Sequence, residues 1–263
     1  MNLTNEYLVK CLSMVETVRA QQSAIAEAAS WFAQSILKGR VVHLFGSGHS
    51  RIMVEEMWPR YGSFPGFNPI VELSMTFHNL VTGANGQRQA MFIENTRGLA
   101  DKILSNFNLS PLDTALIISS SGTSLVPCEM AELFQLKKIK VVSIVTRSHL
   151  ALSESKRADG KKLIDFSDLV LDSGAPAGDA MIQIEGMEMP VSPGSTVGSV
   201  MLINCLKAEL AQQLTQQGLA PKALAAACSV GKERSAAIFE EAYNEHSTRM
   251  SALYNFSKKI SIE

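Results

Sequence analysis

Apolar residues recur at steps of three and four along the first 38 positions of the chain. The series consists of Leu8, Cys11, Val15, Val18, Ile25, Ala29, Phe32 and Ile36. This spacing places the apolar side chains on one face of an α-helix. We therefore predict an amphipathic helix over residues 4–38, which Gly39 ends.

Four short apolar runs without polar alternation follow this helix. They occupy residues 41–45, 113–118, 140–145 and 169–171, and helix-like sequence separates them. Strands with continuous apolar residues are buried on both faces, which is typical of a parallel sheet covered by helices. The pattern predicts an α/β fold with a doubly wound, flavodoxin-like parallel sheet.

The last third of the chain reads as helical. Residues 196–217 carry an apolar stripe behind Ser195 or Thr196, either of which can cap the helix. Residues 222–259 form a more polar helical stretch that we expect to break near 229–231. Before them, 147–165 reads as a surface connection, and 181–191 as either a strand or a packed excursion. We predict one domain over 1–263, made of an N-terminal helix (1–38), an α/β core (39–218) and a C-terminal helical extension (222–263).

Charge and composition exclude several classes of protein. The 24 lysines and arginines balance 25 aspartates and glutamates, and no basic tract indicates nucleic-acid binding. No apolar run approaches the roughly 20 residues that span a bilayer, and the N-terminus lacks the basic start of a signal peptide. We expect a cytoplasmic protein that binds neither nucleic acid nor membrane. The four cysteines are widely separated, which indicates neither a zinc ribbon nor a disulfide framework.

The strand predicted at 113–118 ends in a cluster of hydroxyl side chains around one glycine. The cluster consists of Ser119, Ser120, Ser121, Gly122, Thr123 and Ser124. Gly122 lets the backbone turn and present N–H groups, and a helix beginning here would add its dipole. The segment therefore reads as a phosphate cradle.

A second loop of this kind follows the first predicted strand. It contains Ser47, Gly48, His49 and Ser50. In open α/β sheets, ligands bind beyond the carboxyl ends of the strands, so we expect both loops to hold one phosphate. Each loop alone is also compatible with a simple tight connection. Arg51 stands where the dinucleotide fingerprint needs its third glycine, and the Gly-Lys-Ser/Thr ending of a nucleotide P-loop is missing.

These motifs resemble the sugar isomerase (SIS) domain family, whose members bind phosphosugars. The family motif Ser-x-Ser-Gly-x-Ser/Thr matches Ser119, Ser121 and Ser124 position by position, and the resemblance spans about residues 38–217. It implies that the ligand is a phosphorylated sugar. It also implies a homodimer or homotetramer, because in the family a neighbouring subunit commonly completes the active site.

Residues 46–61 resemble most closely the phosphoheptose isomerase branch and uncharacterised relatives, in which the glycine loop leads into a helix with paired glutamates. Aldose–ketose isomerisation needs a base that moves a proton between adjacent carbons. We predict Glu55 as this base, although Glu56 could face the pocket instead. His49 and His78 are candidates for opening the sugar ring or shuttling protons.

The remaining histidines have simpler interpretations. His43 lies inside a strand and is expected in the core, whereas His149 and His246 are expected to be solvated. The phosphoheptose isomerase branch uses a metal with a histidine ligand on the helix after the last strand, but residues 196–206 contain none. We predict no metal and no cofactor.

The leading hypothesis is therefore an enzyme, a sugar-phosphate isomerase. Three alternatives remain: a lyase or etherase of the same fold, a non-catalytic module that senses phosphosugars, and an NAD-binding oxidoreductase. The first differs only in expelling a leaving group after proton abstraction. The second needs the hydroxyl loops but no base.

Overall fold

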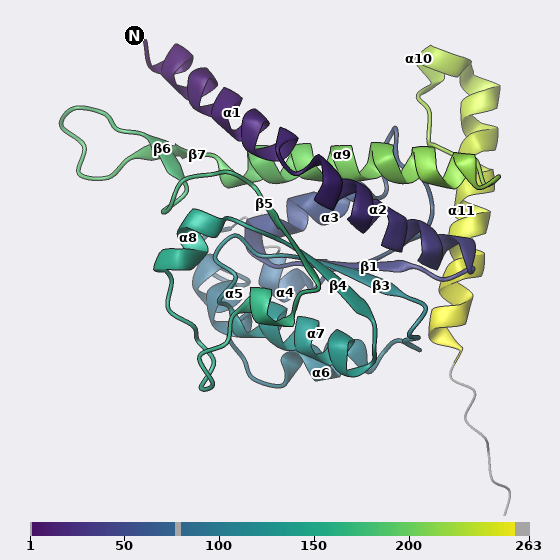
Figure 1. Ribbon diagram of the computed structural model, residues 1–263, viewed down its shortest axis with the longest axis horizontal. Helices are drawn as coiled ribbons and strands as arrows, with labels where there is room; N and C mark the ends of the chain where they lie inside the picture. Colours follow the sequence, from purple (N-terminus) through teal and green to yellow (C-terminus); the bar gives the residue numbers. More distant parts are fainter. Residues whose placement is uncertain (1, 77–79, 256–263) are drawn as a thin grey trace, which may run out of the picture.

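Five parallel strands form the centre of the computed structural model, which describes residues 2–76 and 80–255 (Figure 1). The strands are β1 (Val42–Gly46), β2 (Phe67–Ile70), β3 (Thr114–Ile118), β4 (Lys140–Val145) and β5 (Leu169–Asp172). Their order across the sheet is β2-β1-β3-β4-β5. This is the flavodoxin-like order, so the predicted doubly wound sheet is confirmed.

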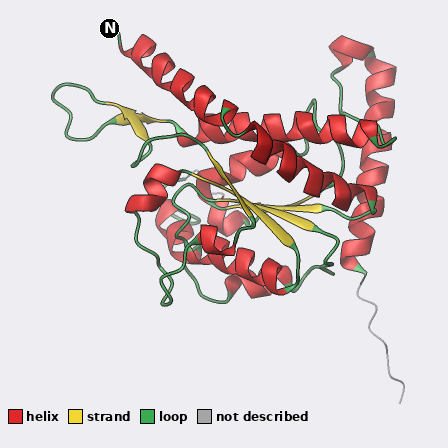
Figure 2. Cartoon of the chain, viewed as in Figure 1, coloured by secondary structure: helices red, strands yellow, loops and turns green. Residues whose placement is uncertain are grey.

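Helices cover both faces of this sheet, as Figure 2 shows. One layer contains α2 (Gln22–Leu37), α3 (Arg51–Met57) and α9 (Ser195–Gln216). The other contains α6 (Leu99–Leu104) and α7 (Leu125–Leu136), with α4 (Leu73–Thr76), α5 (Gln87–Ile93) and α8 (Arg147–Leu152) nearby. Because both faces are covered, every residue of β1 and β3 is buried, which explains the continuous apolar runs.

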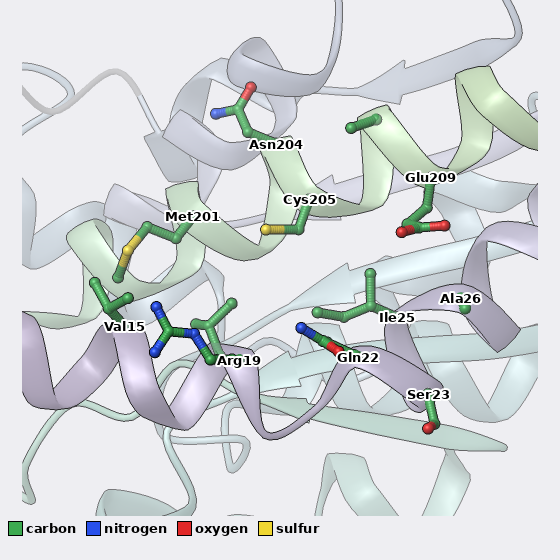
Figure 3. Close-up of a pocket in the computed structure, with 12 residues that line it drawn as sticks. Val15, Arg19, Gln22, Ser23, Ile25, Ala26, Met201, Asn204, Cys205 and Glu209 are labelled. Carbon is green, nitrogen blue, oxygen red and sulfur yellow. The ribbon is translucent and has the colours of Figure 1, made fainter.

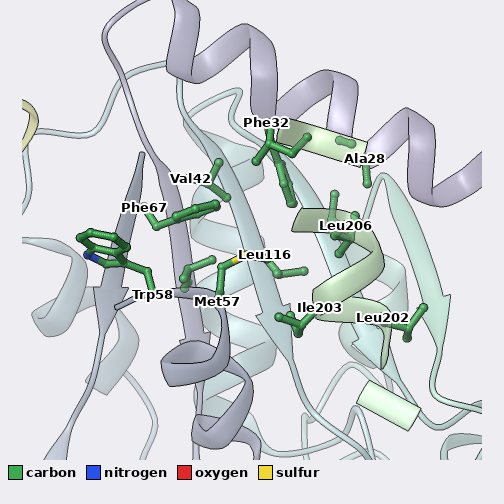
Figure 4. Packing of buried hydrophobic residues seen from close by; sticks show 14 of the residues in the cluster. Ala28, Phe32, Val42, Met57, Trp58, Phe67, Leu116, Leu202, Ile203 and Leu206 are labelled. Atoms are coloured by element: carbon green, nitrogen blue, oxygen red, sulfur yellow. The ribbon is translucent and has the colours of Figure 1, made fainter. Parts of the chain in front are cut away.

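The larger core lies between the sheet and the α2–α9 layer (Figure 4). Phe32 of α2 and Leu206 of α9 meet over Val42 and Leu116 of the sheet, and all four side chains are fully buried. The predicted helix over 196–217 is confirmed as α9. Close contact of α9 with β5 requires Gly198, since a Cβ there would lie 1.9 Å from the carbonyl oxygen of Ser173.

The N-terminal helix is interrupted, unlike the continuous helix expected over 4–38. It forms α1 (Leu3–Arg19) and α2, separated at Ala20 and Gln21. The side-chain amide of Gln21 donates to the carbonyl of Asp172 at 2.9 Å and accepts from its N–H at 2.7 Å. These bonds tie the break between α1 and α2 to the end of β5.

Strand β2 was absent from the sequence prediction. It is only four residues long and contains Asn68 and Pro69, both poor strand formers. Proline is tolerated here because β2 is an edge strand. The helical turn α4 follows β2 directly.

The prediction of a surface connection over residues 147–165 is wrong in part. It begins with α8 and ends in a short 3₁₀ turn, η2 (Leu163–Phe166). Leu150, Leu163 and Phe166 are buried in the core on the α7 side. Their helical segments are too short to show a periodic pattern.

The segment left undecided between strand and excursion is a β-hairpin. Its strands β6 (Ala180–Ile182) and β7 (Val191–Pro193) are antiparallel and pack against α1 (Figure 1). Beyond α9, the helical extension breaks at Gly231 between α10 (Ala227–Val230) and α11 (Lys232–Tyr254), as expected. Arg249 of α11 donates to the carbonyls of Ile36 and Arg40, which fastens α11 to the end of α2.

A buried ionic network lies at the amino end of the sheet. Arg40 donates to both carboxylate oxygens of Asp113 at 2.7 and 2.8 Å. His43, fully buried as expected, has Nε2 3.2 Å from Asp113 and Nδ1 3.0 Å from the amide of Asn68. Burial alone would raise the pKa of Asp113, but the bonds from His43, Arg40 and the N–H of Ser110 outweigh it and lower the pKa.

We predict that this network makes folding sensitive to acid. A carboxyl group with a lowered pKa stabilises the fold fully above its unfolded-state pKa of about 3.9. That stabilisation is lost as the pH falls through the lower folded-state pKa. Urea unfolding between neutral pH and pH about 2.5 should show this loss.

Asp113→Asn should cost about 3–5 kcal/mol at neutral pH, because it leaves Arg40 without its charged partner. It should also flatten the acid limb of the stability profile. Asp101→Asn is the control, since the Asp101 side chain is 62% exposed. An acid limb unchanged by Asp113→Asn would contradict the prediction.

Candidate functional site

The two hydroxyl loops lie side by side at the carboxyl edge of the sheet. β1 pairs with β3 so that Gly46 lies opposite Ile118. The loops that begin at Ser47 and Ser119 therefore leave neighbouring strands at the same level. β1 is also the strand at which the order reverses, with β2 on one side and β3 on the other. Ligands of doubly wound proteins bind at such a switch point.

The loop 119–124 is held in shape by its own hydroxyls. Ser119 Oγ accepts from the N–H of Gly122 at 3.2 Å, and Thr123 Oγ1 donates to Ser121 Oγ at 3.2 Å. Gly122 has φ of 63°, and a Cβ there would lie 2.5 Å from Leu150 Cδ1. Glycine is thus required by both conformation and space.

Hydroxyls also follow the next two strands, although none was predicted for the site. Thr146 comes directly after β4, and Ser173 directly after β5. Ser120 Oγ lies 3.0 Å from Thr146 Oγ1, which lies 2.7 Å from Ser173 Oγ. Each is the first residue after a strand, and this position could have identified both hydroxyls from the sequence.

Glu94 joins the two loops. Ser47 Oγ donates to its Oε2 at 2.8 Å, and Ser124 Oγ donates to its Oε1 at 3.2 Å. Glu94 was not among the residues predicted for the site. It lies just after α5, in a segment without a recognisable motif, so no sequence signal distinguishes it from a surface glutamate.

The segment around Glu94 also covers the start of α7. The carbonyl of Glu94 accepts from the N–H of Val126 at 3.0 Å, and Asn95 Oδ1 accepts from the N–H of Leu125 at 3.3 Å. The helix begins directly after Ser124, as the phosphate-cradle interpretation expects. The N–H groups of Leu125 and Val126, at the start of this helix, are however already bonded to Asn95 and Glu94.

The paired glutamates of α3 point to different surroundings. Glu56 Oε1 accepts from Asn204 of α9 at 2.8 Å, and its other oxygen pairs with Arg60. Burial alone would raise the pKa of Glu56, but the bonds from Asn204 and Arg60 outweigh it and lower the pKa. Glu55 is 56% exposed and lies 3.2 Å from Arg51. Among the described residues, Glu94 rather than Glu55 is the carboxylate that bonds to both loops.

Lys207 connects Glu56 to the core of the helix layer. This lysine is buried on α9, and its Nζ donates to the backbone carbonyl of Glu56 at 2.8 Å, near the end of α3. Burial lowers the pKa of Lys207. The backbone carbonyl and the carboxylate of Glu56 thus both hold α3 against α9.

The histidines occupy three kinds of environment. His49 is exposed in the 3₁₀ turn η1 (Gly48–Ser50) of the first loop, and His78 lies outside the described residues. The expected solvation of His246 is wrong: it is half-buried with its ring 5.5 Å from that of Trp58, and burial together with Arg249 lowers its pKa. His149 is also half-buried.

The start of α9 faces the same edge, but its cap differs from the expected Ser195 or Thr196. Asp179 accepts from the N–H groups of Gly194 and Ser195 at 3.0 and 2.6 Å, and from Ser195 Oγ at 2.8 Å. A carboxylate from the hairpin therefore caps the longest helix of this layer. Long-range capping of this kind leaves no local sequence pattern.

A large hollow lies away from the loops. It is a groove of about 870 Å³ between α1, α2 and α9 (Figure 3). Val15, Gln22, Met201 and Cys205 line it, with Arg19 and Glu209 near its rim, and no residue of either hydroxyl loop contributes.

The described part of the chain contains neither a candidate metal cluster nor a helix that could span a membrane. Residues 2–76 and 80–255 contain no group of three or more histidine, cysteine, aspartate or glutamate side chains arranged to hold a metal ion. None of the helices within these ranges has the length and apolar character to cross a membrane.

The comparisons with known proteins agree with this architecture. The SIS domain model matches residues 6–146, which is more than half of the chain. The chain therefore belongs to the SIS domain family. Its relatives include a UPF0309 protein of Halalkalibacterium halodurans, which is 31% identical over 78% of this chain and 83% of the relative. Another, from Thermoanaerobacter pseudethanolicus, is 30% identical over 82% of this chain and 87% of the relative.

The fold also resembles a solved structure. A phosphoheptose isomerase from Francisella tularensis superimposes with a TM-score of 0.50 at 16% identity, covering 80% of this chain and 96% of that one. At this identity the likeness shows a shared fold.

We predict that the adjacent glutamates of α3 differ sharply in their effect on stability. Glu56→Ala should lower the free energy of unfolding by about 1.5–3 kcal/mol, because it removes hydrogen bonds to charged groups beside the buried Lys207. Glu55→Ala is the matched control and should change it by less than about 0.5 kcal/mol. Urea unfolding measures both, and equal losses would contradict the assignment of Glu56 to the α3–α9 contact.

Proposed function

We propose that this chain is a cytoplasmic phosphosugar-binding enzyme that interconverts an aldose phosphate and a ketose phosphate. The observation that carries this function is the meeting of two hydroxyl loops at the switch point of the sheet, with a carboxylate between them. Membership of the SIS domain family supports a phosphorylated sugar as ligand. The isomerase reaction is supported by the carboxylate at this edge, and a phosphoheptose isomerase shares the fold.

The phosphate would bind where several hydroxyls and backbone N–H groups converge. The candidate donors are Ser47, Gly48, Ser50, Ser119, Ser120, Ser121, Thr123 and Ser124. Hydroxyls can donate to a phosphate oxygen without an opposing charge, and Gly122 lets the backbone approach closely. No lysine or arginine is needed in such a cradle.

The isomerisation itself needs a base and a group that assists ring opening. Two carboxylates are candidates for the base: Glu55 from the sequence, and Glu94 from its place between the two loops. His49 and His78 are candidates for ring opening. A base acts by taking the proton beside the carbonyl, and neighbouring donors stabilise the enediolate. A module that only senses phosphosugars would need none of these groups, and a lyase would use the same base.

We further propose that the chain forms a homodimer or homotetramer. One side of α1 exposes Leu8, Val9 and Leu12, all at least 47% accessible. This face continues into the groove of Figure 3, where Val15 and Val18 follow. Exposed apolar surface of this extent is typical of protein contacts.

A thermal-shift titration should test the ligand class. Hexose, pentose, heptose and amino-sugar phosphates should each be compared with their unphosphorylated forms. A bound ligand at 100 times its Kd stabilises by about 2.7 kcal/mol, so the melting temperature should rise with concentration. Ser121→Ala should reduce the shift, whereas Ser110→Ala, far from this edge, should not. Stabilisation by the unphosphorylated sugars alone would refute a phosphate cradle.

Light scattering coupled to size-exclusion chromatography should test self-association. The wild type should elute as a dimer or tetramer, and the double variant Leu8→Glu, Leu12→Glu should shift toward monomer, because burying two carboxylates is unfavourable. Leu136→Glu is the control, since that leucine is 73% exposed on the opposite helix layer. A wild type that is monomeric at all concentrations would contradict the assembly.

A further inference from the structure

We infer that the hydroxyls at the carboxyl edge divide into two groups: Ser47 and Ser124 position Glu94 as the catalytic base, while Ser119 and Ser121 bind the phosphate. This assignment rests on the proposed function. It gives Ser47 and Ser124 a task other than phosphate binding, and it places the base on the segment after α5 rather than on α3.

The division follows from the number of protons that a hydroxyl can donate. Each serine hydroxyl has one proton. Those of Ser47 and Ser124 are donated to the two oxygens of Glu94, at 2.8 and 3.2 Å. While Glu94 holds them, neither hydroxyl can donate to a phosphate oxygen.

The protons of Ser119 and Ser121 are differently placed. Ser121 Oγ accepts from both the N–H and the hydroxyl of Thr123, and Ser119 Oγ accepts from the N–H of Gly122. These bonds use lone pairs and leave the two serine protons available. In the described part of the chain, neither proton has a hydrogen-bond acceptor. The loop therefore presents Ser119 and Ser121 as donors for an anion.

Glu94 is held in place by its backbone as well as by its side chain. Its carbonyl accepts from the N–H of Val126, and the neighbouring Asn95 accepts from the N–H of Leu125. Both bonds go to the first turn of α7, which follows directly on Ser124. The base and the phosphate loop are thus fixed to the same helix start, and withdrawing Glu94 would break these contacts.

Glu55 has a different setting. Its side chain is half in solvent and pairs with Arg51 one turn earlier on the same helix. It lines a separate groove of about 580 Å³ with Tyr61 and Tyr243. Two positioned hydroxyl donors distinguish Glu94 from Glu55 as the pre-organised carboxylate.

The reaction step balances without a co-reactant. Glu94 takes the proton from the carbon beside the aldehyde of the open-chain sugar. The C–H electron pair becomes the carbon–carbon double bond of the enediol, and the carbonyl pair moves to its oxygen, which takes the proton that the neighbouring hydroxyl gives up. Glu94 then returns its proton to the former aldehyde carbon, and the ketose results.

The division of hydroxyls can be tested without any activity, by calorimetric titration with inorganic phosphate. Ser121→Ala should weaken phosphate binding about tenfold or more, because it removes a bond to a charged group. Ser47→Ala and Ser124→Ala should change it less than about twofold. Glu94→Gln should also leave phosphate affinity within this range.

The role of the base can be tested by deuterium incorporation from deuterium oxide. Ribose 5-phosphate, glucose 6-phosphate, N-acetylglucosamine 6-phosphate and sedoheptulose 7-phosphate serve as probes, with exchange beside the carbonyl followed by NMR. Glu94→Gln should slow exchange by about a hundredfold or more, and Glu94→Asp, which keeps the charge but moves it, by less. Glu55→Gln tests the other candidate base, and it should exchange at least about tenfold faster than Glu94→Gln.

The positioning serines have a kinetic signature of their own. Ser124→Ala should lower kcat about tenfold with KM unchanged, and Ser124→Thr, which restores a hydroxyl, should recover most of it. Ser121→Ala should instead raise KM. A merely structural effect of Ser124 would change both parameters.

Four outcomes would overturn the inference. If Ser124→Ala weakened phosphate binding as much as Ser121→Ala, Ser124 would be a phosphate ligand. Tighter phosphate binding by Glu94→Gln would show that the carboxylate competes for the anion site. Loss of exchange in Glu55→Gln but not in Glu94→Gln or Glu94→Asp would make Glu55 the base. If the wild type exchanged no probe, the proposed isomerase activity and the role of Glu94 as base would both be refuted. Phosphate binding by the variants would still test the assignment of Ser119 and Ser121.

Discussion

The parallel pairing of β1 with β3 is the constraint on which both the core and the site depend. Alternate residues of the two strands face opposite helix layers, so Leu44 and Leu116 pack toward α2 and α9, while Phe45 and Ile117 pack toward α6 and α7. The same register ends both strands at one level, and the hydroxyl loops begin there. A shift of one residue would exchange the two packing faces and separate the loops.

The two ends of the sheet hold polar groups in different ways. At the amino end, Arg40 and Asp113 form a buried ion pair, which joins the chain before β1 to the chain before β3. At the carboxyl end, one carboxylate holds the hydroxyls of Ser47 and Ser124, whereas the hydroxyl protons of Ser119 and Ser121 are left for a ligand. Rigid ionic contacts at one end thus support an adaptable polar surface at the other.

Most of the sheet was predictable from sequence because burial on both faces leaves continuous apolar runs. β2 was not, since its short run contains Asn68 and Pro69, which only an edge position explains. The two loops were predictable because their hydroxyls and glycines are contiguous. Glu94 was not, because its contacts with Ser47 and Ser124 span 47 and 30 positions and arise only when α5 docks. The orientations of Glu55 and Glu56 likewise depend on α9, which lies some 150 positions later.

The bonds of Gln21 to Asp172 have a consequence beyond the change of helix direction. β5 is an edge strand, and exposed edges offer backbone groups to which another chain can add a strand. The amide of Gln21 takes up the outward N–H and carbonyl at the end of this edge. Growth of the sheet beyond β5 is thereby blocked at this point, and this strand edge is protected against fibre-like association.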